Sequence, residues 1–269
     1  MIGGGRIGEA LITGLLESGW DKEDLVIVGR TPVRAGSLQQ RFGIRVTDNV
    51  TDAADAADLI VIAVKPHDVD PVLTELSEST PNSGRDQVLV SLAAGVPTTR
   101  LESALPGFPA ARVMPNTAIA IGRGMSVIAA GRYLREEHMR MVSQVFGAVG
   151  EVVTVAESQM DAVTAVSGSG PAYFFLVAEV MIDGAVHMGL SRDIADQLVR
   201  QTMLGSAALL KTSGLTVAQL RASITPAEGA TAAAVRELEQ RAVRSVFHEA
   251  FNAAARWSLE PGATRTLQC

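Results

Sequence analysis

The sequence is short of several kinds of residue, and each shortage argues against a class of protein. Its only cysteine is Cys269, the last of 269 residues, which excludes a disulfide framework and a cysteine metal cluster and fits a reducing compartment. Lys and Arg number 23 against 29 Asp and Glu, a net charge of −6. Because a surface that follows phosphates needs a basic excess, we expect no nucleic acid partner.

Long apolar runs and metal-binding spacings are missing as well. No apolar run reaches the roughly 18 to 20 residues that span a bilayer, and the sequence opens on Gly3-Gly4-Gly5 and not on a basic and then apolar leader. We therefore expect a cytoplasmic protein with no membrane partner. We also expect no metal site, because the four histidines lie far apart in the chain.

The first half of the chain alternates helical and extended segments. Apolar residues recur at helical spacing over residues 9–16, and Gly19 follows as a stop. Short apolar runs at 25–28, 59–64, 88–92 and 111–114 predict strands that are buried on both faces. This alternation is typical of a parallel, doubly wound sheet. We therefore expect an α/β, Rossmann-like dinucleotide-binding domain over residues 1–155.

After about residue 155 the pattern predicts helices only. One helix should begin at Pro171 and run to about 188, before the stop at Gly189. The next should be capped by Ser191 and run to 211, and a last long helix should be capped by Thr231 and run through 257. An all-α domain over 156–269 is small and has several apolar faces, so we expect a second copy of the chain to complete it.

A glycine-rich segment stands directly before the first helix. Residues 3–8 read Gly-Gly-Gly-Arg-Ile-Gly and fit the dinucleotide-binding pattern G-x-G-x-x-G. Such glycines let the backbone pass close to a pyrophosphate, and the helix N-terminus directs N–H groups at it. We assign to the cofactor site Gly3, Gly5, Arg6, Ile7 and Gly8.

The same pattern normally follows a strand, but only Met1 and Ile2 precede Gly3. We therefore expect the first strand of this domain, which is usually central in the sheet, to be missing. A start further upstream, and a functional protein with a gap or a substitute at that place, both stay open.

The residues after the second expected strand indicate which dinucleotide is bound. An NAD site usually has Asp or Glu there, whereas this chain has Gly29-Arg30-Thr31-Pro32-Val33-Arg34. Two arginines and a hydroxyl suit a 2′-phosphate, which they can hold by charge-assisted hydrogen bonds. The alternative is that Arg30 and Arg34 are ordinary solvated residues. We assign Arg30, Thr31 and Arg34 to the cofactor site and expect NADPH, with NADH as a second possibility.

Five motifs in order resemble a known family. They are the glycine loop, Ala63-Val64-Lys65-Pro66, Arg112-Val113-Met114-Pro115-Asn116-Thr117, Ser167-Gly168-Ser169-Gly170-Pro171-Ala172-Tyr173, and the segment 224–239. Together they resemble pyrroline-5-carboxylate reductase, the last enzyme of proline biosynthesis, over nearly the whole chain. The resemblance implies a Rossmann-like domain, a helical dimerisation domain and a homodimer that often assembles further. It also implies NAD(P)H-dependent reduction of 1-pyrroline-5-carboxylate to L-proline, which makes the chain an oxidoreductase acting on a C=N bond.

The resemblance also assigns site residues. Asn49 matches the residue at the adenosine end of the cofactor, and the loop along the ribose and pyrophosphate matches Ala63, Val64, Lys65 and Pro66. The loop beside the nicotinamide matches Met114, Pro115 and Asn116. For Lys65 the alternative is a surface lysine at a strand end. The small residues of 167–173 suit either tight helix packing or direct substrate contact, and Ser169 is assigned to the substrate site.

The substrate loop departs from the family. The family usually reads close to Thr-Ser-Pro-Gly-Gly-Thr-Thr, or a variant that ends in Ala-Thr, whereas residues 225–231 read Thr-Pro-Ala-Glu-Gly-Ala-Thr and so retain Gly229, Ala230 and Thr231. Gly229, Ala230 and Thr231 are assigned to the substrate carboxylate, and the hydroxyl of Thr231 either bonds the ring nitrogen, as the catalytic residue, or caps the helix. Pro226 removes a hydroxyl and an N–H donor, and Glu228 brings a negative charge.

Three functions fit these observations. The first is reduction of pyrroline-5-carboxylate, which the intact cofactor motifs favour. The second is reduction of another cyclic imine or carbonyl acid, and the third is a non-catalytic, NADP-binding regulatory paralogue. The changes at Pro226 and Glu228 motivate the second and third, because both alter the loop that should bind a carboxylate.

Overall fold

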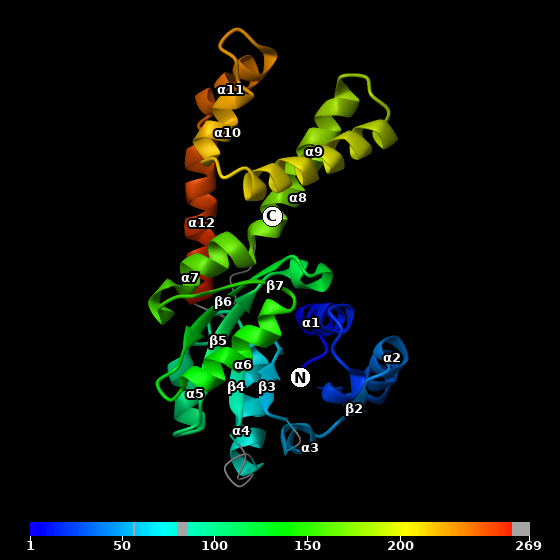
Figure 1. The fold of residues 1–269 in the computed structure, drawn as a ribbon, viewed down its shortest axis with the longest axis vertical. Coiled ribbons are helices and arrows are strands. Elements are labelled where there is room, and N and C mark those ends of the chain that lie inside the picture. The colour runs from blue at the N-terminus through cyan, green and yellow to red at the C-terminus, as the bar shows by residue number, and fades with distance from the viewer. Residues whose placement is uncertain (56, 80–85, 260–269) are drawn as a thin grey trace. The chain divides into compact units, whose positions relative to one another are not determined.

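The computed structural model describes residues 1–55, 57–79 and 86–259, so Cys269 lies outside the described residues. Contacts divide the chain into two compact units, Met1–Pro171 with Ala253–Cys269, and Ala172–Asn252. We call them unit 1 and unit 2. The first contains the sheet and the second is helical (Figure 1). This division begins later in the chain than the boundary expected at residue 155.

Unit 1 is built on a sheet that is joined only narrowly near its middle. Its strands are β1 (Val26–Val28), β2 (Arg45–Thr47), β3 (Leu59–Ile62), β4 (Val88–Ser91), β5 (Ala110–Pro115), β6 (Gly124–Ala130) and β7 (Gly150–Thr154). β1 pairs with β2, and the other five follow the order β3-β4-β5-β6-β7. Each pair is parallel except β5 with β6. Ile2 forms parallel bridges to both Val28 and Ile62, so a single residue stands where a central strand is expected.

Helices cover both faces of this sheet. They are α1 (Arg6–Glu17), α2 (Pro32–Phe42), α3 (Val50–Asp55), α4 (Val69–Ser79), α5 (Thr98–Ala104), α6 (Glu136–Gly147) and α7 (Met160–Val163). Short turns of helix lie at η1 (Lys22–Asp24), η2 (Pro66–Asp68), η4 (Thr117–Ile121), η5 (Glu157–Gln159) and η6 (Thr164–Gly168), the last being π-helical.

Alternate residues of β3 belong to different apolar cores. Ile60 and Ile62 pack in the core that α3, α4 and α5 cover, while Val61 packs in the core of α1 and α6, which includes the fully buried Phe146. Successive side chains of a strand point to opposite faces of its sheet. The continuous apolar run of β3 therefore reflects burial on both sides.

The expected strands at 25–28, 59–64, 88–92 and 111–114 are confirmed as β1, β3, β4 and β5. The sequence analysis missed β2, β6 and β7. β2 and β7 are largely exposed or half-buried, so neither carries the apolar run that marks a central strand. The antiparallel pairing of β5 with β6 also departs from a purely parallel sheet.

Unit 2 consists of α9 (Arg192–Thr212), α10 (Val217–Ser223) and α11 (Ala230–Gln240), with most of α8 (Gly170–His187) and the first part of α12 (Val243–Leu259). The expected stop and cap are confirmed, since Gly189 has a φ of +99° and the N–H of Ile194 donates to the Ser191 hydroxyl at 3.4 Å. Small residues with positive φ and hydroxyl caps are ordinary helix boundaries.

The expectation of one long last helix capped by Thr231 is wrong. Gly229 is the N-cap and Thr231 lies within the first turn. The helix starts early because the N–H of Gly229 donates to the Pro226 carbonyl at 2.9 Å, which turns the chain into the helix. The helix is then interrupted at Ala242, whose φ is +56°. No Gly or Pro marks this break, so its sequence carries no helix-stop signal.

Candidate functional site

The glycine loop joins Ile2 to α1 at the carboxyl ends of β1 and β3. Gly3 has a φ of +110°, and a Cβ there would lie 2.8 Å from the carbonyl of Ala63. A Cβ on Gly8 would lie 2.4 Å from the Gly3 oxygen, whereas a Cβ on Gly5 would meet nothing within 4 Å. Gly3 and Gly8 are therefore required by the turn itself, since a side chain at either would clash with the backbone. Gly5, the N-cap of α1, leaves open space at a helix N-terminus, as a bound pyrophosphate needs.

The arginines after β1 surround a carboxylate that the sequence analysis did not assign. The guanidinium of Arg34 donates to the Gly4 carbonyl and to Glu9, and Arg41 donates to the other oxygen of Glu9. The Thr31 hydroxyl caps α2 by accepting from the Arg34 N–H at 3.3 Å, and Arg30 is exposed. Arg34 is thus fixed beside the glycine loop, at the sheet edge where dinucleotides bind.

The remaining residues that the sequence analysis assigns to the cofactor follow the ends of neighbouring strands. Ala63, which is buried, Val64, Lys65 and Pro66 come directly after β3. Lys65 is exposed, and its carbonyl accepts from the Asp68 N–H at 2.9 Å. Asn49 follows β2, and its side-chain oxygen accepts from the Asp52 N–H at 3.1 Å. Carboxyl ends of parallel strands meet at one edge of a sheet, which is the ligand edge of this fold.

A cavity of about 420 Å³ brings together the predicted nicotinamide loop and Ser169. Five of its lining residues were assigned from the sequence: Ile7, Met114, Pro115, Asn116 and Ser169. The lining residues that the sequence analysis left unassigned are Ala94, Thr117, Thr164, Gly168, Ala254 and Trp257. Trp257 and Ala254 carried no signal because they lie in a helical pattern far along the chain. This volume is that of a small-molecule site.

Asn116 fixes the shape of this cavity. Its side-chain oxygen accepts from the N–H groups of Ala118 and Met125 at 3.2 and 3.3 Å, and its amide donates to the Ser167 carbonyl at 3.3 Å. The side chain therefore ties the loop after β5 to η6. The Ser167 hydroxyl is buried without a hydrogen-bond partner among the described residues, and a buried hydroxyl of this kind is expected to bond a ligand or water.

A buried ion-pair network holds the segment beneath the cavity. Arg112 is 3% exposed and lies in β5, two residues before Met114. Its guanidinium bonds Glu157 at 3.0 Å and lies 3.6 Å from Asp161, which also accepts from the Ser258 hydroxyl at 2.7 Å. The network joins β5 to η5, α7 and the C-terminal end of α12, all within unit 1.

One cluster of possible metal ligands proves to be an ion pair. The ligand atoms of Asp86, Glu137 and His138 lie within 4.8 Å of one another. However, Nδ1 of His138 accepts from the Arg135 N–H at 3.2 Å, and the Arg135 guanidinium bonds Asp86. The hydrogen bond from His138 holds the pKa of the Asp86 carboxyl below its usual value. The cluster therefore caps α6 and needs no cation.

Known proteins resemble the chain along almost its full length. Residues 157–260 match a family described as pyrroline-5-carboxylate reductase dimerisation. Residues 1–95 match a second family, which is described as NADP oxidoreductase coenzyme F420-dependent. The chain is 47% identical to the pyrroline-5-carboxylate reductase of Mycobacterium leprae, over 94% of this chain and 93% of the relative. The chain belongs to the pyrroline-5-carboxylate reductase family. The reductase of Corynebacterium melassecola is 42% identical over 97% of both chains.

Solved reductases of the family share the fold. The structure of a pyrroline-5-carboxylate reductase from Coxiella burnetii has a TM-score of 0.88 at 32% identity, over 98% of this chain and 97% of that one. The Plasmodium falciparum pyrroline carboxylate reductase with NADP bound has a TM-score of 0.87 at 29% identity, over 97% of both. A Rossmann-like N-terminal domain with a helical dimerisation domain is thus confirmed.

The dimerisation match explains exposed apolar surface in this family member. On α8, Phe174, Phe175 and Val180 are each 64% exposed. Among the described residues, one stretch, Glu157–His187, is long and apolar enough by length and composition to cross a membrane. Because the dimerisation model covers these same residues, a second subunit accounts for the apolar surface, and the chain forms a homodimer.

Residues 225–231, which the sequence analysis assigns to the substrate loop, lie in unit 2, whereas Ser169 and the residues assigned to the cofactor lie in unit 1. The ring of Pro226 packs against Gly229, because a Cβ on Gly229 would lie 2.9 Å from Cγ of Pro226. Ala230 and Thr231 open α11, where their N–H groups belong to the unpaired first turn of a helix. Glu228 and Thr231 are both exposed. The change to glutamate at 228 therefore costs this chain no burial of charge.

Proposed function

We propose that the chain reduces 1-pyrroline-5-carboxylate to L-proline with NADPH and takes NADH less readily. The observation that carries this proposal is the cavity of about 420 Å³ where Met114, Asn116 and Ser169 meet beside the start of α1. It lies in a chain that aligns over 94% of its length with a pyrroline-5-carboxylate reductase. The reaction makes the protein an enzyme of amino-acid biosynthesis.

We assign the cofactor to the carboxyl edge of the sheet. The open face of Gly5 and the α1 N-terminus suit the pyrophosphate. Arg30, Thr31 and Arg34 suit the 2′-phosphate, because they replace the acidic residue of an NAD site with cations. Asn49 and residues 63–66 are assigned to the adenosine and ribose, and residues 114–116 to the nicotinamide.

The chemistry asks the protein mainly for position. The bound dinucleotide supplies the hydride that reduces the C=N carbon. A protonated cyclic imine accepts it without a strong acid, so the protein must fix the ring and its carboxylate. We assign the carboxylate to the N–H groups of Gly229, Ala230 and Thr231, and the ring nitrogen to the Thr231 hydroxyl. Ser169 is also assigned to the substrate.

Pro226 and Glu228 raise one alternative, a change of substrate to another cyclic imine or carbonyl acid. A negative side chain near the carboxylate position repels an anionic substrate, by about 4 kcal/mol for two charges ~4 Å apart at an effective dielectric of 20. Since Glu228 is exposed, solvent screens most of that repulsion. This favours pyrroline-5-carboxylate as the substrate.

Assembly beyond the dimer and cellular location complete the proposal. We propose dimers that associate further, in the cytoplasm, with no nucleic acid or membrane partner. Residues 1–155 would bind the dinucleotide and residues 156–269 the substrate and the second subunit. Light scattering tests the assembly: an active, stable monomer at micromolar concentration contradicts it.

Oxidation of NADPH by the purified protein in the presence of pyrroline-5-carboxylate tests the activity. We expect substrate-dependent loss of NADPH and matching formation of proline. Turnover of a different cyclic imine acid, with none of pyrroline-5-carboxylate, would support the changed substrate. NADPH binding without turnover of any of them would support the regulatory paralogue and refute the reductase.

A further inference from the structure

The cavity at Met114, Asn116 and Ser169 is also lined by Trp257, which lies in the C-terminal turn of α12. Among the residues that the structure describes, no other aromatic side chain and no charged side chain lines this cavity. Trp257 is 61% exposed, so protein atoms cover less than half of it. A large aromatic side chain that lines a cavity and is mostly uncovered is available to bind a ligand.

A buried network fixes the backbone that carries Trp257. The hydroxyl of the next residue, Ser258, is fully buried and donates to Asp161 at 2.7 Å. Asp161 lies 3.6 Å from the guanidinium of Arg112. Arg112 and Met114 are two residues apart in β5, so their side chains lie on the same face of the sheet. The strand that supplies Met114 to the cavity therefore also fixes the end of α12.

Hydride transfer creates a positive charge in the part of the cavity assigned to the nicotinamide, beside residues 114–116. The reduced nicotinamide ring is neutral. When the hydride leaves its C4 with two electrons and joins the C=N carbon, the nicotinamide ring becomes a cation, and the imine nitrogen keeps its proton and loses its charge. No described lining residue has a carboxylate. The negative face of an aromatic ring is therefore the lining group best suited to attract this charge.

We propose that Trp257 contacts the nicotinamide ring and stabilises its oxidised, positively charged form, and that Ser258, Asp161 and Arg112 hold the end of α12 in place for this contact. The proposal rests on the assignment of the nicotinamide to residues 114–116. Because the charge appears only as the hydride leaves, the contact is stronger in the transition state than in the complex with NADPH, and such differential binding raises kcat. Trp257 is then a catalytic residue, and the other three are positioning residues.

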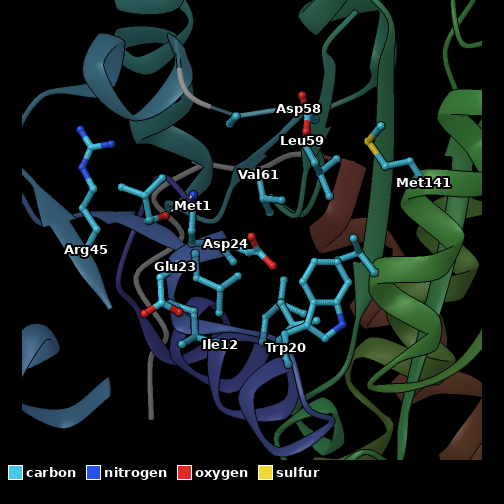
Figure 2. A pocket seen from close by; sticks show the side chains of 16 residues that line it. Met1, Ile12, Trp20, Glu23, Asp24, Arg45, Asp58, Leu59, Val61 and Met141 are labelled. Carbon is cyan, nitrogen blue, oxygen red and sulfur yellow. Dashed lines mark hydrogen bonds between the residues drawn. The ribbon is translucent and has the colours of Figure 1, made fainter. Parts of the chain in front are cut away.

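The second tryptophan of the chain, Trp20, provides a matched control. It lines a separate cavity of about 390 Å³, together with Met1 and Met141 (Figure 2). None of the residues that line this cavity lines the one at Trp257. The change Trp20→Phe therefore leaves Trp257 as the only indole of the protein and leaves its cavity intact.

The test uses the Trp20→Phe protein, produced with tryptophan that carries no, one, two or three fluorine atoms. Fluorine weakens the negative face of the indole and changes its shape little. Titration calorimetry measures the dissociation constants of NADP and NADPH. Each fluorine should weaken the binding of NADP by a further factor of about two and leave the binding of NADPH unchanged, because only the oxidised ring is a cation. Trp257→Leu should weaken NADP binding about tenfold.

Variants of Ser258 test the positioning. Ser258→Ala removes the donor to Asp161 and should weaken NADP binding about threefold, whereas Ser258→Thr keeps a hydroxyl and should restore it. In a protein that already carries Trp257→Leu, Ser258→Ala should have no further effect on NADP binding, because the network acts through the indole. A merely structural role of Ser258 would instead lower the affinities for NADP and NADPH equally, in the presence or absence of Trp257.

An NADP affinity that does not change with the number of fluorine atoms would overturn the proposal, and so would equal losses of NADP and NADPH affinity. Dissociation of the dimer by Trp257→Leu in sedimentation, with NADP affinity unchanged, would place Trp257 at the subunit interface and would also contradict it. These binding measurements need no turnover. Absence of reductase activity would therefore refute the proposed function alone, whereas activity that persists with unchanged NADP affinity in every variant would refute only the role of Trp257.

Discussion

The buried Met1 amine should make the stability of this chain rise with pH in the neutral range. Its pKa is about 5 in the folded protein, because burial disfavours the ammonium form, against 8.0 for the ordinary group. Between these values the unfolded chain binds more protons than the folded chain, so the free energy of unfolding increases with pH. The penalty on folding is complete below pH 5 and absent above pH 8.

The size of the effect follows from the shift. A change of about three pKa units corresponds to about 4 kcal/mol at 1.36 kcal/mol per unit, with a slope near 1.4 kcal/mol per pH unit inside the window. The charged groups that line the same cavity as Met1 are Glu23, Asp24, Asp58 and Arg45, and all four are exposed.

Urea unfolding from pH 5.5 to 8 measures this dependence. The matched control is the same chain with an acetylated Met1 nitrogen. The acetylated nitrogen does not titrate in this range, and all other titratable groups, the histidines included, are the same in both chains. We expect the unmodified chain to gain stability with pH relative to the acetylated chain, by about 3 kcal/mol over the range. Identical pH profiles for the two chains, or a gain in the opposite direction, would refute the reasoning.

Three further changes test the site. Arg34→Ala should weaken NADPH binding about tenfold and leave NADH binding unchanged, because a charge-assisted contact to the 2′-phosphate is lost. Arg41→Ala, which also removes a guanidinium from Glu9, is the control. Equal losses of NADPH and NADH affinity in Arg34→Ala, measured by titration, would contradict the assignment. Arg112→Ala should lower the free energy of unfolding by about 3 kcal/mol, since it leaves the carboxylates of Glu157 and Asp161 uncompensated; a loss below ~1 kcal/mol in urea unfolding would show that the network is not stabilising. Thr231→Ala should lower kcat for the imine at unchanged NADPH affinity, whereas Thr231→Ser should retain most of it, and equal kinetics in all three proteins would place the ring nitrogen elsewhere.

Much of the fold was predictable because its central strands are buried on two faces. β3 and β4 carry unbroken apolar runs, and periodicity identifies such runs directly. β2 and β7 have exposed faces and little apolar pattern. The break at Ala242 was not predictable either, because an alanine with positive φ carries no local signal.

Residues could be assigned to the candidate site from the sequence where a motif is contiguous, and not where tertiary packing brings residues together. The glycine loop was assigned from its spacing, and residues 114–116 were assigned from the resemblance to the family. Glu9, which orients Arg34, and Trp257, which lines the cavity, come from ordinary helical positions. Only the fold brings such residues to the site, since helical periodicity does not separate a packing residue from one that faces a ligand.

Isotope transfer tests the proposed reaction most directly. The purified protein is incubated with pyrroline-5-carboxylate and NADPH that carries deuterium at both positions of C4 of the nicotinamide, and the product is analysed by mass spectrometry and NMR. We predict singly deuterated L-proline with the deuterium on the ring carbon of the former C=N bond, formed in proportion to the NADP produced. Proline without deuterium, or oxidation of NADPH that forms no proline, would contradict direct hydride transfer in the cavity at Met114, Asn116 and Ser169.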